Sequence, residues 1–190
     1  QEKRNKHIHR IKSSVNNLTS LLNEFLSIGK IEDGKIRTNN IEFNLKEMIA
    51  SLCTEMEAIA KPGQHIHFSH TGDELIFSDP TLFRNVVTNL LSNAIKFTPE
   101  KGKICIGVHE HPSFLEIYVQ DSGMGMSHEA LMRIRNNDYF TTKGTASESG
   151  TGLGLMLCKE FLVRNGGQLY IESEPGEGST FSFSVPKPGK

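Results

Sequence analysis

The sequence has few cysteines and no excess of charge of either sign. Its 190 residues include three cysteines, Cys53, Cys105 and Cys158, which stand far apart and lack the spacing of a metal site. We therefore expect buried free thiols in a reducing compartment. The 21 basic and 22 acidic residues nearly cancel, so the composition indicates no general surface for nucleic acid or membrane.

Long hydrophobic runs are absent as well. No apolar stretch reaches the roughly 20 residues that a membrane-spanning helix needs, and no signal-peptide pattern is visible. The eight histidines include no pair at helical ligand spacing. His65 and His67 alternate along an expected strand, which indicates an exposed face rather than a metal site. A chain of this length predicts one domain or slightly more, with a real core.

The most informative stretch runs from residue 79 to residue 98. Asp79 followed by Pro80 predicts a helix start, because the carboxylate caps free N–H groups and proline lacks an N–H group. Pro99 predicts the end of this helix. One broad arc is apolar and is expected to face the core; it contains Leu82, Phe83, Val86, Val87, Leu90, Leu91, Ala94 and Ile95.

The opposite arc of this helix carries Asn85, Asn89, Asn93 and Lys96. Asparagine is a poorer helix former than alanine by roughly half a kcal/mol per site, and an ordinary solvated face uses other residues. Amide oxygens suit a Mg²⁺ ion that already carries phosphate ligands, and a nearby lysine can bind a phosphate. On this stretch alone, a solvated face that happens to hold asparagine is an equally good interpretation.

Two glycine clusters follow the asparagine helix. Asp121-Ser-Gly123-Met-Gly125 comes after an expected strand, and Gly150-Thr-Gly152-Leu-Gly154-Leu opens an expected helix. In this order, behind an Asn-x3-Asn-x2-Lys helix, they resemble the ATP-binding domain of sensor histidine kinases. The wider group is the GHKL or HATPase superfamily, with gyrase, the heat-shock chaperone ATPase and mismatch-repair ATPases. The resemblance runs from about Ile41 to Pro186 and includes the motifs of the family in order.

The hydrophobic pattern predicts an α/β chain in which helices and strands are mixed. We expect helices at 45–60, 79–98, 127–134 and 153–164, and strands at 41–43, 65–69, 74–77, 103–109, 114–120, 168–173 and 180–185. This order predicts an α+β two-layer sandwich, with helices on one face of a mixed sheet. The resemblance implies the Bergerat-type ATP-binding fold of GHKL proteins, preceded by one long bundle helix.

The first 31 residues contain a sharp heptad pattern. Its apolar positions step by 3 and 4 along the chain, at Ile8, Ile11, Val15, Leu18, Leu22 and Phe25. Such spacing is typical of a coiled-coil or bundle helix, so we expect a homodimer through residues 1–31. By resemblance, residues 1–34 are the second helix of the dimerisation domain, 35–40 a linker, and 41–190 the catalytic domain.

The phosphoacceptor of the family is a histidine followed by an acidic residue. His7 is followed by Ile8 and His9 by Arg10, so neither matches, and both are expected to be surface residues. The acceptor helix is therefore expected upstream of residue 1. The resemblance also implies a cognate response regulator and an upstream sensor as partners. The expected setting is the cytoplasmic portion of a membrane-bound bacterial sensor kinase.

The resemblance implies a role for each motif residue. Asp121 would accept a hydrogen bond from the 6-amino group of adenine, because a carboxylate only accepts. Asn93 would bind Mg²⁺ with Asn89 assisting, and the glycines would bring backbone N–H groups to the nucleotide. Residues about 127 to 149 would form the ATP lid. The predicted ATP contacts are Asn89, Asn93, Lys96, Phe97, Asp121, Gly123, Gly125, Met126, Phe140, Thr142, Lys143, Gly150, Thr151, Gly152, Leu153, Gly154, Leu155 and Ser179.

Asn89 separates two classes of the superfamily. The hydrolysing members carry glutamate at the matching position, where it activates water, and asparagine cannot take a proton. We therefore expect a chain that holds ATP and Mg²⁺ for transfer of the γ-phosphate to a histidine, with relay to a response regulator aspartate. A serine-kinase anti-sigma factor and a nucleotide-binding pseudokinase are the alternatives.

Overall fold

The structure is a computed structural model that describes residues 38–72, 74–136, 144–146 and 152–187. The chain divides into two units between Arg37 and Thr38, and all described residues belong to the second unit. The predicted heptad helix at 1–31 lies outside the described residues. None of the described helices is long and apolar enough to cross a membrane.

The described helices and strands follow the predicted order closely. They are β1 (Ile41–Asn44), α2 (Leu45–Glu57), β2 (His65–His70), β3 (Leu75–Ser78), α3 (Pro80–Phe97), β4 (Lys103–Glu110), β5 (Phe114–Asp121), α4 (His128–Arg135), α5 (Gly154–Arg164), β6 (Leu169–Glu174) and β7 (Gly178–Pro186).

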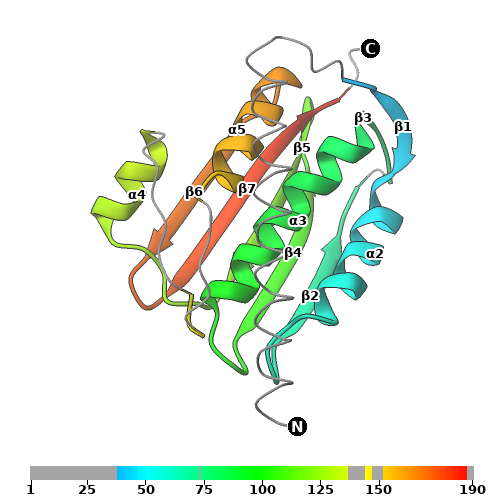
Figure 1. Cartoon of the computed structure of the whole chain (residues 1–190). Coiled ribbons are helices and arrows are strands. Elements are labelled where there is room, and N and C mark those ends of the chain that lie inside the picture. Colours follow the sequence, from blue (N-terminus) through cyan, green and yellow to red (C-terminus); the bar gives the residue numbers. More distant parts are fainter. Residues whose placement is uncertain (1–37, 73, 137–143, 147–151, 188–190) are drawn as a thin grey trace, which may run out of the picture. The chain divides into compact units, whose positions relative to one another are not determined.

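Five of the strands form one mixed sheet in the order β2-β4-β5-β7-β6. β2 pairs with β4 in parallel, and the other neighbours in this sheet are antiparallel. Helices α2, α3 and α5 lie on one face of the sheet (Figure 1). The predicted mixed sheet with helices on one face is therefore confirmed.

The two strands on either side of Gly72 belong to different sheets. β3 pairs with β1 in a two-stranded antiparallel sheet, whereas β2 pairs with β4. A parallel pair needs a long crossover connection, and here β3 and α3 lie within that connection. The alternation of polar and apolar residues predicts each strand, but it does not predict which other strand it pairs with.

The core lies between the helices and the covered face of the sheet. Its fully buried residues include Ile49 and Leu52 of α2, Leu90 of α3, Ile106 of β4 and Phe183 of β7. The helix predicted at 45–60 ends earlier than expected, because α2 ends at Glu57, and Ile59 beyond it is 62% exposed. Its N–H group instead donates to the carbonyl of Met56 in the turn that closes the helix.

The cysteines differ in burial. Cys53 and Cys158 are buried, as predicted, and burial raises the pKa of the Cys53 thiol to about 11, so the thiolate is scarce at neutral pH. Cys105 is only partly buried, which corrects the prediction for this residue. It alternates with the core residues Ile104 and Ile106 on β4, so its side chain points to the opposite face of the sheet.

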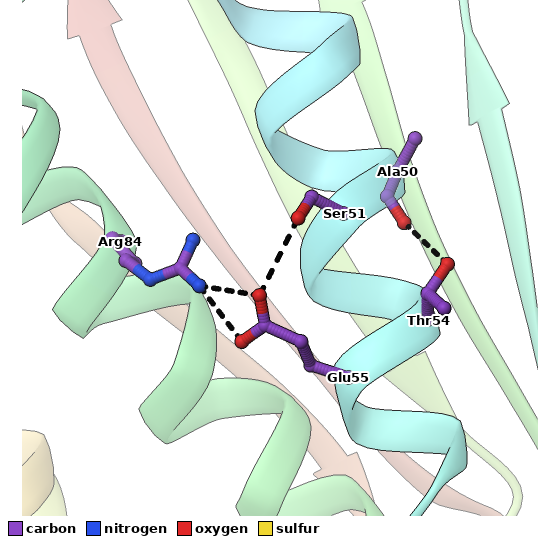
Figure 2. A network of polar contacts seen from close by, with 5 residues as sticks. All are labelled: Ala50, Ser51, Thr54, Glu55 and Arg84. Carbon is purple, nitrogen blue, oxygen red and sulfur yellow. Dashed lines mark hydrogen bonds and ion pairs between the residues drawn. The ribbon is translucent and has the colours of Figure 1, made fainter.

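An ion pair joins α2 to α3 on the surface. Figure 2 shows Arg84 of α3 reaching Glu55 of α2, where one guanidinium nitrogen contacts the two carboxylate oxygens at 2.5 and 2.7 Å. The hydroxyl of Ser51 contacts the same carboxylate at 3.4 Å. Because both ionic side chains are over 40% exposed, the pair contributes about 0–1 kcal/mol to stability.

Asp79 links the start of α3 to the chain that precedes β1. One carboxylate oxygen accepts from the N–H groups of Thr81 and Leu82 at 2.9 and 3.0 Å, which is the predicted cap. The other oxygen accepts from the N–H group of Asn39 at 2.8 Å. Asp79 is buried, and both of its carboxylate oxygens accept hydrogen bonds from backbone N–H groups.

Replacing this aspartate should destabilise the fold. Asp79→Ala removes three acceptor contacts, and we expect the free energy of unfolding to fall by about 2 kcal/mol, as lost caps do. Asp79→Asn keeps one acceptor oxygen and should lose less. Chemical denaturation of the two variants beside the wild type measures this, and an unchanged midpoint for Asp79→Ala would show that the cap is dispensable.

Candidate functional site

The predicted site residues that the structure describes lie at the last turns of α3, the end of β5 and the start of α5. The N–H group of Met124 donates to the carbonyl of Phe97 at 3.1 Å, which joins the segment after β5 to the end of α3. Gly154, the first residue of α5, lies against the side chain of Asn89. The segment after β5 therefore contacts the end of α3, and the start of α5 contacts its polar arc.

Asp121 is the last residue of β5 and is only 6% exposed. One oxygen of its carboxylate accepts from the N–H group of Gly123 at 2.8 Å. Burial raises the pKa of Asp121, and hydrogen bonds from the backbone N–H groups of Gly123 and Ser179 offset part of this rise. The result is a buried acceptor whose orientation is set by the backbone around it.

The glycines after Asp121 permit close contact with neighbouring backbone. A Cβ atom at Gly123 would lie 2.5 Å from the carbonyl oxygen of Phe97. A Cβ atom at Gly125 would lie 1.9 Å from the carbonyl oxygen of Glu174, and the φ angle of Gly125 is +63°. Neither position accepts a larger residue without movement of the backbone. These glycines thus keep the segment close to the end of α3 and to β6.

Asn89 and Asn93 contact each other on successive turns of α3. The amino group of Asn93 donates to the amide oxygen of Asn89 at 3.2 Å, and both residues are partly buried. Because this bond uses the amino group of Asn93, it leaves the amide oxygen of that residue for a hard cation.

The described residues contain no group of three or more His, Cys, Asp or Glu side chains that could hold a metal by themselves. Neutral amide oxygens instead fit a Mg²⁺ ion that takes most of its ligands from phosphate and water. Asn93, with Asn89 beside it, is the donor set that fits such an ion. The two amide side chains do not form a complete metal cage by themselves, so an ion at this position would need ligands from a nucleotide or water.

The start of α5 faces this asparagine pair. A Cβ atom at Gly154 would lie 2.1 Å from the amide nitrogen of Asn89. The N-cap position holds Leu153, whose side chain has no oxygen to cap the first N–H groups of the helix. N–H groups at a helix start attract anions such as phosphate. The contact through Gly154 therefore places the start of α5 beside the predicted metal ligands.

Lys96 and Phe97 lie together in the last turn of α3. The ammonium group of Lys96 is 4.5 Å from the centre of the Phe97 ring. Both side chains are partly buried. The two predicted contacts to phosphate and nucleoside are therefore neighbours, one turn beyond Asn93.

Ser179 meets Asp121 through its backbone rather than its hydroxyl. The two residues pair in register across β5 and β7, and the backbone N–H of Ser179 lowers the pKa of Asp121. The hydroxyl of Ser179 lies 2.9 Å from the hydroxyl of Ser173. Ser173 also accepts from the N–H group of Met126 at 2.9 Å. Sequence reasoning missed Ser173, although its place opposite Ser179 in a hairpin could have indicated it.

Part of the predicted site falls outside the described residues: Phe140, Thr142, Lys143, Gly150 and Thr151. Within the stretch predicted as the lid, the structure describes α4 and residues 144–146. The guanidinium of Arg135, at the end of α4, donates to the carbonyl of Ile171 on β6 at 3.1 Å. The hydroxyl of Ser127 caps α4, as predicted, by accepting from Ala130 at 3.2 Å.

Comparison with known proteins identifies the group to which this arrangement is similar. A family profile described as "Histidine kinase-, DNA gyrase B-, and HSP90-like ATPase" matches residues 78–189. The sensor protein GacS of Pseudomonas syringae pv. syringae is 36% identical over 188 residues, which cover 94% of this chain and 20% of GacS. The chain thus spans about a fifth of the length of that relative.

Solved structures show the same fold. The catalytic domain of histidine kinase ThkA superposes with a TM-score of 0.67 at 31% identity, over 78% of this chain and 98% of that domain. ThkA in complex with its response regulator protein TrrA superposes with a TM-score of 0.69 at 26% identity, over 94% of this chain and 52% of the ThkA chain.

Proposed function

The chain belongs to the histidine kinase-, DNA gyrase B- and HSP90-like ATPase family, and from this premise we propose that it is the ATP-binding catalytic domain of a sensor histidine kinase. The observation that carries the proposal is that the glycine segment after Asp121 and the start of α5 both lie against α3, the helix that carries the pair Asn89 and Asn93. The names of the matched relatives favour a sensor kinase over a serine-kinase anti-sigma factor or a pseudokinase.

Each group would contribute a distinct contact to the nucleotide. The Asp121 carboxylate would accept from the 6-amino group of adenine, and it would repel the oxygen that guanine carries there. The start of α5, with Gly152, Gly154 and Leu155, would bind the phosphates through N–H groups, and Lys96 would add a positive charge. Asn93 and Asn89 would hold Mg²⁺, which neutralises charge on the phosphates.

Asn89 sets the outcome of the reaction. It lies within hydrogen-bond reach of Asn93 and against Gly154, so it would lie between the proposed metal ligand and the proposed phosphate-binding helix start. An amide cannot remove a proton from water. The γ-phosphate is therefore proposed to pass to a histidine of the dimerisation domain, and from it to an aspartate of a response regulator, rather than to water.

The purified chain should bind Mg²⁺·ATP and release phosphate only at the background rate. Calorimetric titration with a non-hydrolysable ATP analogue, with the GTP analogue as the matched control, measures binding and base selectivity. A coupled phosphate assay on the same sample measures hydrolysis. Equal affinity for the two analogues would contradict the role of Asp121, and rapid phosphate release would contradict the role of Asn89.

We also propose the domain plan, the setting and the partners that the function requires. Residues 1–34 would be the second dimerisation helix, 35–40 the linker, 41–190 the catalytic domain, and about 127–149 the ATP lid. The whole kinase would be membrane-bound with this portion in the cytoplasm, and it would act on a response regulator. The complex of ThkA with TrrA supports the last partner.

Self-association should depend on the heptad residues. Leu18→Asp combined with Leu22→Asp places two charges in the predicted seam of the homodimer and should give a monomer. Binding of the ATP analogue should be unchanged, because these positions lie outside the residues that form the site. Analytical ultracentrifugation of both chains tests this, and a wild type that stays monomeric at high concentration would exclude the dimer.

A further inference from the structure

Two side chains from the turn after α2 bind the carboxyl end of α3. The ammonium group of Lys61 donates to the carbonyls of Lys96 and Thr98 at 2.8 and 3.1 Å. The amide of Gln64 donates to the carbonyl of Thr98 at 2.8 Å, and its side chain is buried. The last carbonyls of a helix have no partners within the helix, and a positive charge there is favourable. Lys61 and Gln64 thus supply hydrogen-bond donors to carbonyl groups that find no partner within α3.

Thr145 binds the same carbonyls from a distant part of the sequence. Its N–H group donates to the carbonyl of Lys96 at 3.1 Å, and its hydroxyl lies 3.0 Å from the carbonyl of Thr98. The same hydroxyl accepts from the ammonium group of Lys61 at 2.5 Å. Lys61 therefore joins three segments: the turn after α2, the end of α3 and residue 145 of the predicted lid.

These contacts act on the turn that carries two of the proposed nucleotide contacts. Lys96 and Phe97 lie within the held turn, and the carbonyl of Phe97 accepts from Met124 in the segment after Asp121. A shift of this turn would move the phosphate contact, the nucleoside contact and the glycine segment together. A polar cluster that fixes it lowers the cost of ordering the site when the nucleotide binds.

We propose that Lys61 and Thr145 are positioning residues of the nucleotide site, which hold the last turn of α3 in the geometry that binds ATP. The inference rests on the proposed function and adds to it residues that none of the nucleotide motifs includes. Neither residue needs to contact the nucleotide. Their effect passes through the carbonyls of Lys96 and Thr98.

A double-mutant cycle tests this role in the 190-residue chain. Thr145→Val removes the hydroxyl and Lys61→Met removes the ammonium group, and each should weaken binding of the Mg²⁺·ATP analogue about tenfold. Because the two residues bind the same carbonyls and each other, the double variant should lose less affinity than the sum of the two single losses. Additive losses, or unchanged affinity in both single variants, overturn the proposal.

Two further variants separate positioning from general stability. Thr145 is exposed, so Thr145→Val should leave the melting temperature almost unchanged while affinity falls, and Thr145→Ser should restore the affinity. Lys46→Met is the matched lysine control, because Lys46 pairs with Glu74 on the surface of α2. An affinity loss in Lys46→Met equal to that in Lys61→Met would overturn the specific role of Lys61.

Hydrogen exchange at the Thr145 amide gives a readout that needs no nucleotide. This N–H group should exchange several-fold faster in Lys61→Met than in Lys46→Met, because the contact that holds it has been weakened. Equal rates overturn the proposed contact. A wild-type chain that bound no nucleotide would instead refute the proposed function itself, so the two failures are distinguishable.

Discussion

Asp121→Asn should weaken binding of an ATP analogue by about 100-fold, because the buried carboxylate is replaced by a group that cannot accept on both sides. One carboxylate oxygen already accepts from Gly123 at 2.8 Å. The amide would keep that acceptor by turning its amino group toward the base, where it would face the 6-amino donor of adenine. Two donors would then oppose each other at a position that is only 6% exposed.

Glu116→Gln is the matched control for this substitution. It makes the same chemical change on β5, at a partly exposed residue that pairs with His111 rather than with the site. We expect unchanged affinity for the control. Isothermal titration of the two variants with the same analogue compares them directly, and wild-type affinity in Asp121→Asn would remove Asp121 from the base-binding role.

The raised pKa of Asp121 adds a pH-dependent prediction. Burial makes the folded, nucleotide-free protein hold this proton more tightly than the unfolded chain does. The carboxyl group therefore contributes most to stability at low pH, and this contribution is lost as the pH rises through the raised pKa. Asp121→Asn lacks this titration, so its melting temperature should improve relative to the wild type as the pH rises from the unfolded-state pKa of the carboxyl group through its raised pKa in the folded protein. A melting temperature of Asp121→Asn that falls relative to the wild type as the pH rises would contradict the argument that burial raises the pKa of Asp121.

Asn93→Ala should abolish the dependence of nucleotide binding on Mg²⁺. The variant removes the amide oxygen proposed as metal ligand and leaves Asn89 without its partner on α3. In the presence of Mg²⁺ we expect affinity to fall by about tenfold or more, to the value seen with EDTA, because the hard cation loses its main proposed protein ligand. Phosphotransfer should be lost as well.

Asn85→Ala provides the control on the same helix. Asn85 belongs to the same polar arc but is exposed and lies two turns before Asn93. It should bind the analogue like the wild type, with and without Mg²⁺. If Asn93→Ala kept a Mg²⁺-dependent affinity, the asparagine arc would be only a solvated face.

Local patterns in the sequence predicted the elements better than their partners. The cap at Asp79 and the breaker at Pro99 predicted α3 to within one residue, because capping is decided by neighbours in the chain. The pairing of β3 with β1 could not be predicted, since the alternation of polar and apolar residues predicts a strand but not its pairing partner. The exposure of Ile59 depends on where α2 unwinds, which the apolar spacing does not reveal.

For the candidate site as well, local motifs could be predicted from the sequence, but contacts between distant residues could not. Asp121, Asn93 and Gly154 were predicted from motifs, and the fold brings their segments together, although their roles toward ATP remain predictions. Lys61 and Thr145 are 84 positions apart and form no motif, so only the structure joins them. The hydroxyl of Ser179 lies beside that of Ser173, because the β6–β7 hairpin places those two residues opposite each other.

Transfer of labelled phosphate from γ-labelled ATP to a supplied dimerisation domain tests the proposed kinase activity most directly. The chain is incubated with Mg²⁺ and labelled ATP, with and without a separate domain that carries the acceptor histidine. We predict acid-labile label on that domain, no label on the chain itself, and no transfer by Asp121→Asn. Acid-stable label on a serine of the partner, or free phosphate as the only product, would contradict a histidine kinase.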